Sequence, residues 1–151
     1  MAADAITVEI VYPYPVEHVW KALTNRDSLA AWLMPNDFEP QIGHKFTFRA
    51  MSDKGWTGTI YCQIVALEPP HRVAYTWRGD PNQWETLVTF DLESTEGGTR
   101  LRLEHTGFEA GGKMGSSARD MMASGWGTNI LRERLFAFLG KEAQHATSSN
   151  S

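Results

Sequence analysis

The side chains that could hold a metal ion or attack a substrate are few and far apart in this sequence. Five histidines are present, but none are spaced as His-x-His or His-x-x-x-His, and the chain has one cysteine, Cys62. A metal site needs several such ligands close together, so we expect no metal and no cofactor. Cys62 lies in the middle of an apolar strand pattern, which favours a buried structural thiol over a nucleophile. No serine occupies a Gly-x-Ser-x-Gly motif, and no catalytic residue is predicted.

The glycine-rich segment from Gly107 to Met114 comes close to the phosphate-binding motif Gly-x-x-x-x-Gly-Lys-Ser/Thr. Its last position is Met114, whose side chain cannot bind Mg²⁺ as a hydroxyl would. The segment also follows a series of antiparallel strands, whereas the phosphate-binding loop belongs to a strand–loop–helix unit of parallel sheets. We therefore interpret residues 107–117 as a flexible entrance to a cavity.

His105 differs from the other histidines because it shares the apolar face of a predicted strand with Leu101 and Leu103. One interpretation is a partly buried histidine that bonds to a neighbouring hydroxyl or carbonyl group. The other is a polar anchor, or an acid–base group, inside a cavity. Glu85 and Glu104 fall on the opposite face of the strands, which favours a solvated role over paired-carboxylate catalysis.

Two periodicities divide the chain into the elements that would position these residues. Apolar residues alternate over Ile6–Tyr12, which predicts a half-buried strand. Helical spacing then predicts two short helices over 15–24 and 25–33, the second capped by Asn25. From His44 onward the alternation returns, and turn residues separate five further strands. These are predicted at His44–Ala50, Trp56–Leu67, Arg72–Arg78, Gln83–Glu93 and Thr99–Thr106.

A long amphipathic helix is predicted over residues 118–139, and at ~33 Å it would cross a whole sheet. Met121, Met122 and Trp126 on its apolar stripe suit either core packing or the lining of an adaptable pocket. Successive short strands followed by one long helix predict an α+β fold. The expected architecture is a curved antiparallel β-sheet of about six strands wrapped around a long C-terminal α-helix, with two short helices after the first strand.

The length of 151 residues suits a single domain. Residues 1–140 would form it, and residues 141–151 would be a disordered C-terminal tail. Apolar residues make up 42% and charged residues 21%, which excludes wholesale disorder. The formal net charge of −4 gives no reason to expect a nucleic acid or an anionic membrane as a partner. No basic N-terminal segment or long apolar run is present, so we expect a cytoplasmic protein, either a monomer or a homodimer.

Several segments of the chain together resemble one protein family. They are PVEHVWKALTNRDSLAAWLMPNDFEPQIGHKFTFRA, ETLVTFDL, GGTRLRLEHTGF and GWGTNILRERLFAFL. They are similar to homologues of the activator of the heat-shock-protein-90 ATPase, a branch of the START-like (SRPBCC) superfamily, and the similarity runs from about Ile6 to Leu139. The resemblance implies a helix-grip fold, in which the sheet wraps the C-terminal helix around a mostly apolar cavity. It implies no fixed catalytic residues, and it connects the family with the stress response.

Six tryptophans and six methionines are unusual in a chain of this size. They would either form a heavily aromatic core or line a cavity for an apolar or aromatic ligand. Our main hypothesis is a small soluble protein that binds a hydrophobic or aromatic small molecule between the sheet and the C-terminal helix. Its candidate ligand-binding residues are Trp32, Phe48, Trp56, Tyr75, Trp77, Trp84, His105, Met122 and Trp126.

Two other functions are compatible with the resemblance. Related START-like domains include cyclases or aromatases that act on polyketides, for which His105 and Tyr75 would be the first acid–base candidates. This interpretation lacks a second convincing acid or base on the inward face. A chaperone partner is less favoured, because in the eukaryotic co-chaperones this domain is only part of a longer chain.

Overall fold

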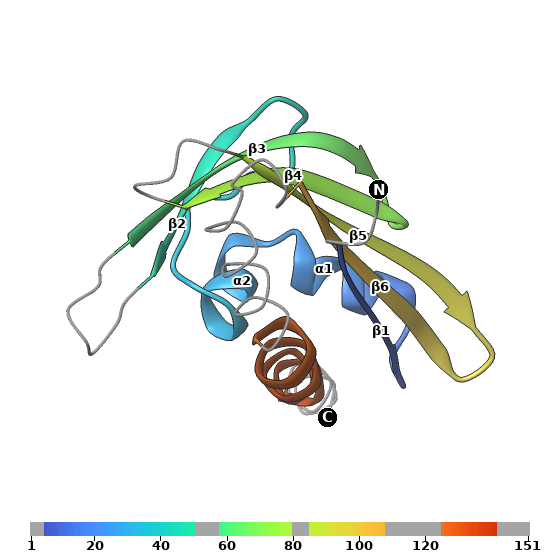
Figure 1. Ribbon diagram of the computed structural model, residues 1–151. Coiled ribbons are helices and arrows are strands. Elements are labelled where there is room, and N and C mark those ends of the chain that lie inside the picture. Colours follow the sequence, from blue (N-terminus) through green and yellow to red (C-terminus); the bar gives the residue numbers. More distant parts are fainter. Residues whose placement is uncertain (1–4, 51–57, 80–84, 108–124, 142–151) are drawn as a thin grey trace.

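Six strands form a single antiparallel sheet with the order β1-β6-β5-β4-β3-β2 (Figure 1). They are β1 (Ile6–Tyr12), β2 (Lys45–Ala50), β3 (Gly58–Glu68), β4 (Arg72–Gly79), β5 (Thr86–Thr95) and β6 (Gly98–Thr106). The computed structural model describes residues 5–50, 58–79, 85–107 and 125–141, without the side chains of residues 50, 58, 79 and 125–129. The predicted α+β fold with about six strands is confirmed.

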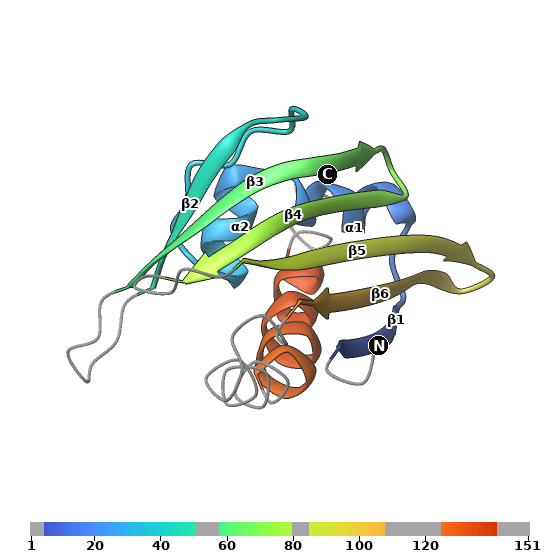
Figure 2. The same cartoon turned by 45° about the horizontal axis from the view of Figure 1, so that its top comes forward.

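The helices of the described chain lie on the concave side of the sheet, which arches over them (Figures 1 and 2). α1 covers Val16–Leu23 and α2 covers Arg26–Trp32. The C-terminal helix contains η3 (Gly125–Leu135), with turns of the wider π type, and its helical backbone continues to Lys141. None of the described helices has the length and apolar character of a membrane span. Residues 118–124 of the predicted helix, and 108–117 of the predicted entrance loop, lie outside the described residues.

The two short helices form where the sequence predicts them, because their ends and apolar faces are well specified. Asn25 Oδ1 accepts a hydrogen bond from the backbone N–H of Ser28 at 3.0 Å. This bond satisfies one of the free N–H groups at the start of α2, so the predicted cap is confirmed. Val19 and Leu23 of α1 and Leu29 of α2 are buried. Burial of these apolar faces seats both helices under the sheet.

Side-chain hydrogen bonds and a set of buried leucines hold the C-terminal helix, and one of these bonds runs from Arg134 Nη1 to Leu33 O at 3.4 Å. Tyr12 Oη of β1 donates to Leu131 O at 2.8 Å, and His18 Nε2 of α1 donates to Leu139 O at 3.0 Å. Leu131, Leu135 and Leu139 are fully buried. The helix packs beside β1 and α2, and it thereby closes the concave side of the sheet at that end.

The outer edge of β2 is covered by the segment that precedes it. The Thr47 N–H donates to Asp37 Oδ1 at 2.6 Å, and the Arg49 N–H donates to Pro35 O at 2.9 Å. These bonds occupy donors that an unprotected edge would offer to another strand. The bond from the Thr47 amide is the main reason that the pKa of Asp37 lies below its usual value. The segment is thereby held against the sheet, with Phe38 in the core.

Candidate functional site

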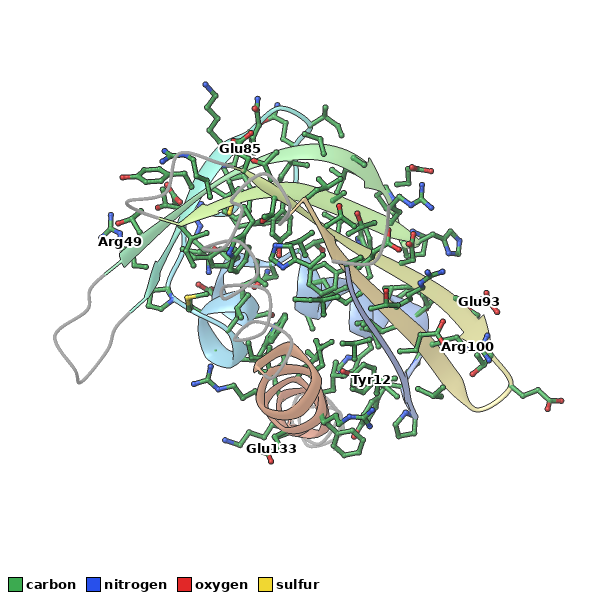
Figure 3. The ribbon with its side chains drawn as sticks, in the orientation of Figure 1. Tyr12, Arg49, Glu85, Glu93, Arg100 and Glu133 are labelled. Carbon is green, nitrogen blue, oxygen red and sulfur yellow. The ribbon has the colours of Figure 1, made fainter. Side chains whose placement is uncertain are left out.

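The concave face of the sheet carries a continuous set of buried rings, which we call the aromatic wall. Neighbouring ring centroids lie between 5.2 and 6.2 Å apart. The ring of Phe46 meets those of Phe48 and Tyr75 edge to face, an arrangement that aromatic rings favour, and the other pairs are tilted. The charged side chains that Figure 3 labels, such as Glu85 and Glu93, lie at the periphery instead. The aromatic wall consists of Phe46, Phe48, Tyr75, Trp77 and Phe90.

Strand periodicity and register bring these rings together. On β2 and on β4 the two rings are two residues apart, so both point to the concave face. β3 lies between β2 and β4 and contributes smaller buried side chains, Ile60, Cys62 and Ile64. The rings of Phe46 and Tyr75, from the two outer strands of this group, therefore reach one another, with centroids 5.2 Å apart.

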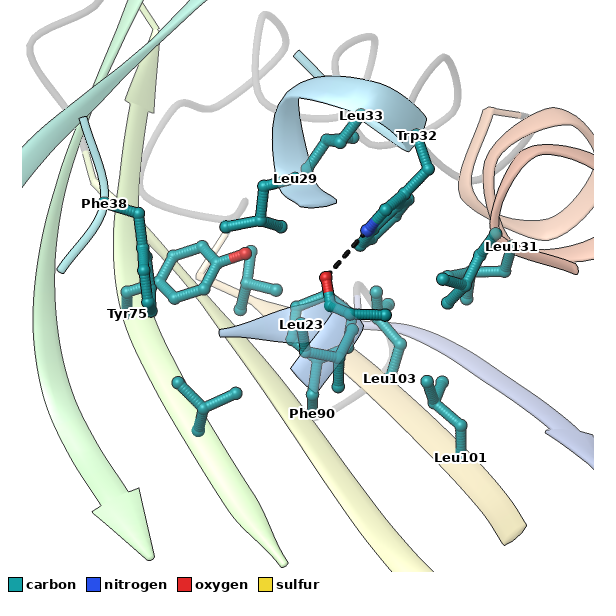
Figure 4. Packing of buried hydrophobic residues seen from close by; sticks show 14 of the residues in the cluster. Leu23, Leu29, Trp32, Leu33, Phe38, Tyr75, Phe90, Leu101, Leu103 and Leu131 are labelled. Carbon is teal, nitrogen blue, oxygen red and sulfur yellow. Dashed lines mark hydrogen bonds between the residues drawn. The ribbon is translucent and has the colours of Figure 1, made fainter. Parts of the chain in front are cut away.

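The hydroxyl of Tyr75 is a buried polar group of the aromatic wall that makes no hydrogen bond to a described residue. The residue is 1% exposed, and its Oη has no hydrogen-bond partner among the described residues. Figure 4 shows this hydroxyl turned from β4 toward Leu29 of α2. Burial, more than the nearby Cys62, raises the pKa of Tyr75 well above its usual value, so the hydroxyl stays protonated. An unpaired buried hydroxyl costs about 1–3 kcal/mol in proteins. A hydrogen-bond acceptor from outside the described residues would remove this cost.

His105, in contrast, has a partner. Thr86 Oγ1 donates to Trp77 O at 2.9 Å, so its oxygen accepts the N–H of His105 Nε2 at 2.6 Å. The imidazole also meets the edge of Trp77, with ring centroids 5.8 Å apart. Burial lowers the pKa of His105 to about 3. The histidine is therefore a neutral, satisfied group, as the first of the two interpretations predicts, and its pKa lies far from the value that suits an acid–base catalyst at neutral pH.

Cys62 behaves as predicted. Its side chain is buried on β3, and burial, with smaller contributions from Asp37 and Glu85, raises the pKa of the thiol. The thiolate is therefore strongly disfavoured, and a reactive nucleophile is not formed here. Among the described residues, no group of three or more histidine, cysteine or acidic side chains is placed to hold a metal ion.

The convex face of the sheet is charged, and its central row, which we call the charge ladder, alternates in sign. Neighbours in this row are paired in register across β1, β6, β5, β4 and β3. Arg72 Nε, for example, lies 2.7 Å from Asp91 Oδ1. Each charge thus has opposite charges beside it on the same face. The charge ladder consists of Glu9, Arg102, Asp91, Arg72 and Glu68.

Three grooves lined by described residues open on the outer surface. The largest, of about 600 Å³, lies over the charge ladder, and one of about 360 Å³ lies at the β2–β3–β4 end around Tyr61 and Arg78. The third, of about 370 Å³, lies between Tyr14 and the β5–β6 turn. The cavity predicted between the sheet and the C-terminal helix is not one of these grooves, and part of its predicted lining lies outside the described residues.

The family of this chain follows from its sequence match. The family described as activator of Hsp90 ATPase homolog 1-like protein matches residues 13–140, which is most of the 151-residue chain. The chain belongs to this family. Membership in this branch of the START-like superfamily confirms the resemblance seen in the sequence, and the six-stranded curved sheet over a C-terminal helix is the fold expected for it.

Solved structures of similar proteins have the same fold as this chain. Protein MLL2253 from Mesorhizobium loti is 32% identical, with a TM-score of 0.75 over 93% of this chain and 97% of its own. Protein BH1534 from Bacillus halodurans is 29% identical, with a TM-score of 0.71 over 89% and 96%. DynU16, a protein in the dynemicin biosynthetic locus, is 23% identical, with a TM-score of 0.75 over 91% of this chain and 47% of its own. No curated protein matches the chain.

The structure describes the side chains of five of the nine residues that were predicted to bind a ligand. Phe48, Tyr75 and Trp77 belong to the aromatic wall, and His105 lies beside Trp77. Trp32 is also buried, and its indole N–H donates to Ala22 O of α1 at 2.8 Å (Figure 4). The other predicted positions are not described in side-chain detail: Trp56, Trp84 and Met122 lie outside the described residues, and Trp126 is described only in its backbone.

Sequence reasoning left three rings out of the predicted site. Phe46 and Phe90 alternate with polar residues on predicted strands, so the signal that places them on the wall was present. Phe38 lies in the segment between α2 and β2, where no periodicity exists, yet its ring is buried 5.1 Å from that of Phe46. Phe38 is placed there by the hydrogen bonds that tie this segment to β2 and by bonds of its own backbone to the side chains of Arg26 and Asn36.

Proposed function

We propose that this protein binds a small, largely apolar molecule against the aromatic wall, between the sheet and the helices. The observation that carries the proposal is the hydroxyl of Tyr75, which is buried within a wall of rings and has no hydrogen-bond partner among the described residues. A purely structural core at this position would be expected to carry phenylalanine, since the hydroxyl adds a desolvation cost without a hydrogen bond. A ligand that occupies the concave side could supply the missing partner.

The composition of the wall supports an apolar ligand. Ligand sites in proteins are lined mainly by hydrophobic and aromatic side chains, with a small number of polar groups that orient the ligand. The wall supplies five rings, and Tyr75 supplies one such polar group. The occurrence of a protein of the same fold in the dynemicin biosynthetic locus is in keeping with a small-molecule ligand.

A titration tests the proposal directly. Naphthalene, added up to its solubility limit, is expected to quench or shift the tryptophan fluorescence, because Trp77 belongs to the wall, and to raise the Tm by mass action. Absence of both effects with naphthalene and with its more soluble derivatives would contradict the proposed function.

A matched pair of variants locates the binding site. Val88 is fully buried and lies in register between Tyr75 and His105, so Val88→Phe should place an additional ring beside Tyr75 on the concave side and abolish binding. Val11→Phe adds the same ring at an exposed position of β1, where the side chain is 55% exposed, and should leave binding unchanged. Equal binding by both variants would show that the ligand lies elsewhere.

The other parts of the functional hypothesis stay predictions. They comprise the cytoplasmic location, a role in the stress response, the oligomeric state, and the cyclase-like and chaperone-partner alternatives. The neutral, hydrogen-bonded state of His105 does not favour the cyclase-like alternative.

A further inference from the structure

The polarity of the concave face restricts which molecules could bind there. The side chains of the aromatic wall and of its neighbours on β3, β5 and β6 are mostly apolar. The buried described residues of these strands that carry a polar group outside an indole ring are Cys62, Tyr75, Thr86, Thr99 and His105. Thr99 Oγ1 donates to Tyr14 O at 2.7 Å. Thr86 and His105 bond to each other, and Thr86 also donates to Trp77 O. The hydroxyl of Tyr75 has no hydrogen-bond partner in the part of the chain that the structure describes.

The structure assigns to this site an uncharged aromatic or polycyclic ligand that carries one hydrogen-bond acceptor, such as a ketone oxygen, placed against the Tyr75 hydroxyl. This inference rests on the proposed function, and it adds the chemical class of the ligand and the atom that recognises it. A phenolic hydroxyl is a good hydrogen-bond donor. A carbonyl oxygen about 2.5–3.0 Å from Tyr75 Oη would accept an ordinary O–H···O hydrogen bond from it.

Charge placement excludes ionic ligands from the same position. The members of the charge ladder lie on the convex face and pair with one another, so none of them can neutralise an ion on the concave face. The buried titratable groups that the described strands place on the concave side are Tyr12, Cys62, Tyr75 and His105, and burial keeps each of them neutral. It raises the pKa of both tyrosines and of Cys62 and lowers that of His105. An anion or a cation placed there would lose its hydration without gaining a counter-charge from these groups or from the charge ladder.

Three ligands of nearly equal shape test this inference: naphthalene, its methyl ketone and its carboxylate. With the wild-type protein at neutral pH, the methyl ketone is expected to bind roughly tenfold more tightly than naphthalene, as one additional buried hydrogen bond would give. The carboxylate is expected to bind at least about tenfold more weakly than the ketone, because its charge must be desolvated. Titration calorimetry or tryptophan fluorescence measures all three dissociation constants.

Two tyrosine variants identify the recognising atom. Tyr75→Phe keeps the ring and removes the hydroxyl, so it should bind the ketone and naphthalene about equally. Tyr61→Phe removes a hydroxyl from the outer surface of β3, where the residue is 40% exposed, and should retain the preference for the ketone.

The outcomes separate this inference from the proposed function. If none of the three compounds binds to the wild-type protein, the proposed function fails and the inference fails with it. If naphthalene binds but the ketone shows no advantage, or the carboxylate binds as tightly as the ketone, the inference is overturned while the function stands. Retention of the ketone preference by Tyr75→Phe would also overturn it. The wild-type series decides the matter even if a variant does not fold.

Discussion

Replacing Tyr75 with phenylalanine should make the ligand-free protein more stable. The residue is 1% exposed and its hydroxyl has no partner among the described residues, whereas an unpaired buried hydroxyl costs about 1–3 kcal/mol. Phenylalanine keeps the ring contacts with Phe46 and Phe90 and removes the unpaired group. We expect the free energy of unfolding to rise by about 1–3 kcal/mol. For a domain of this size, this corresponds to an increase in Tm of roughly 2–12 °C.

Tyr12 provides a matched control, since it is equally buried but its hydroxyl is used. It donates to Leu131 O at 2.8 Å and so joins β1 to the C-terminal helix. Tyr12→Phe removes the donor and leaves a buried carbonyl without its partner, so the free energy of unfolding should fall by about 1–2 kcal/mol. The same chemical change is therefore expected to have opposite signs at the two positions.

Urea unfolding at neutral pH, followed by far-ultraviolet circular dichroism, measures both effects. The protein should first be refolded from denaturant, so that no apolar molecule bound during expression remains. Equal m values in the wild type and the variants would show that the changes in midpoint report stability alone. A loss of stability in Tyr75→Phe comparable to that in Tyr12→Phe would refute the reasoning, because it would mean that the Tyr75 hydroxyl has a partner in the ligand-free protein.

Three further predictions concern the groups around the site. His105 has a pKa of about 3 in the folded protein against about 6.5 when unfolded, so the unfolded state takes up the proton first. The free energy of unfolding should therefore fall as the pH drops from about 6.5 toward about 3. His105→Gln keeps an N–H donor for Thr86 and should make the free energy of unfolding less dependent on pH in this range. An unchanged pH dependence in the variant would contradict the lowered pKa of His105. The pKa of Asp37 is lowered by the Thr47 amide, so its stabilising bond is present at neutral pH and is lost as the pH falls below about 4. Asp37→Asn should lower the free energy of unfolding at neutral pH by about 0.5–1 kcal/mol, and the stability of the variant should change less than that of the wild type below about pH 4. Equal stability of variant and wild type at neutral pH would argue against a stabilising bond between Asp37 and Thr47. Leu131→Ala should cost about 2–5 kcal/mol in urea unfolding, since Leu131 is fully buried under the sheet; a cost below about 1 kcal/mol would mean that the C-terminal helix is not packed there as described.

The positions of the strands could be predicted because each of them carries a local signal. Apolar alternation on β1, β4 and β6 is strict enough to give both the strand and the face it buries, as Ile6, Val73 and Leu103 show. Asn25 could be predicted as a cap for the same reason, since its bond to Ser28 spans three residues. In each case the determining interactions lie within one element or one turn.

Interactions between strands could not be predicted in this way. The charge ladder depends on five strands being in one register, and the turns that set this register tolerate more than one pairing. Likewise, Phe38 reaches the core because Asp37 and Pro35 bond to the edge of β2. Alternation shows which face a residue occupies, but it does not show which residue lies opposite.

The same limit applies to the two polar residues that the sequence places on the concave face. Tyr75 and His105 occupy one cross-strand row, separated by Val88, and alternation makes them equivalent. His105 attracts attention in a sequence because imidazole suits both catalysis and ligand anchoring. In the fold, however, register sets Thr86 within 2.6 Å of the imidazole, whereas Tyr75 is surrounded by rings. The histidine therefore has a hydrogen-bond partner, whereas the tyrosine hydroxyl has none among the described residues. Specificity for a ligand should respond to loss of the Tyr75 hydroxyl far more than to replacement of His105 by glutamine.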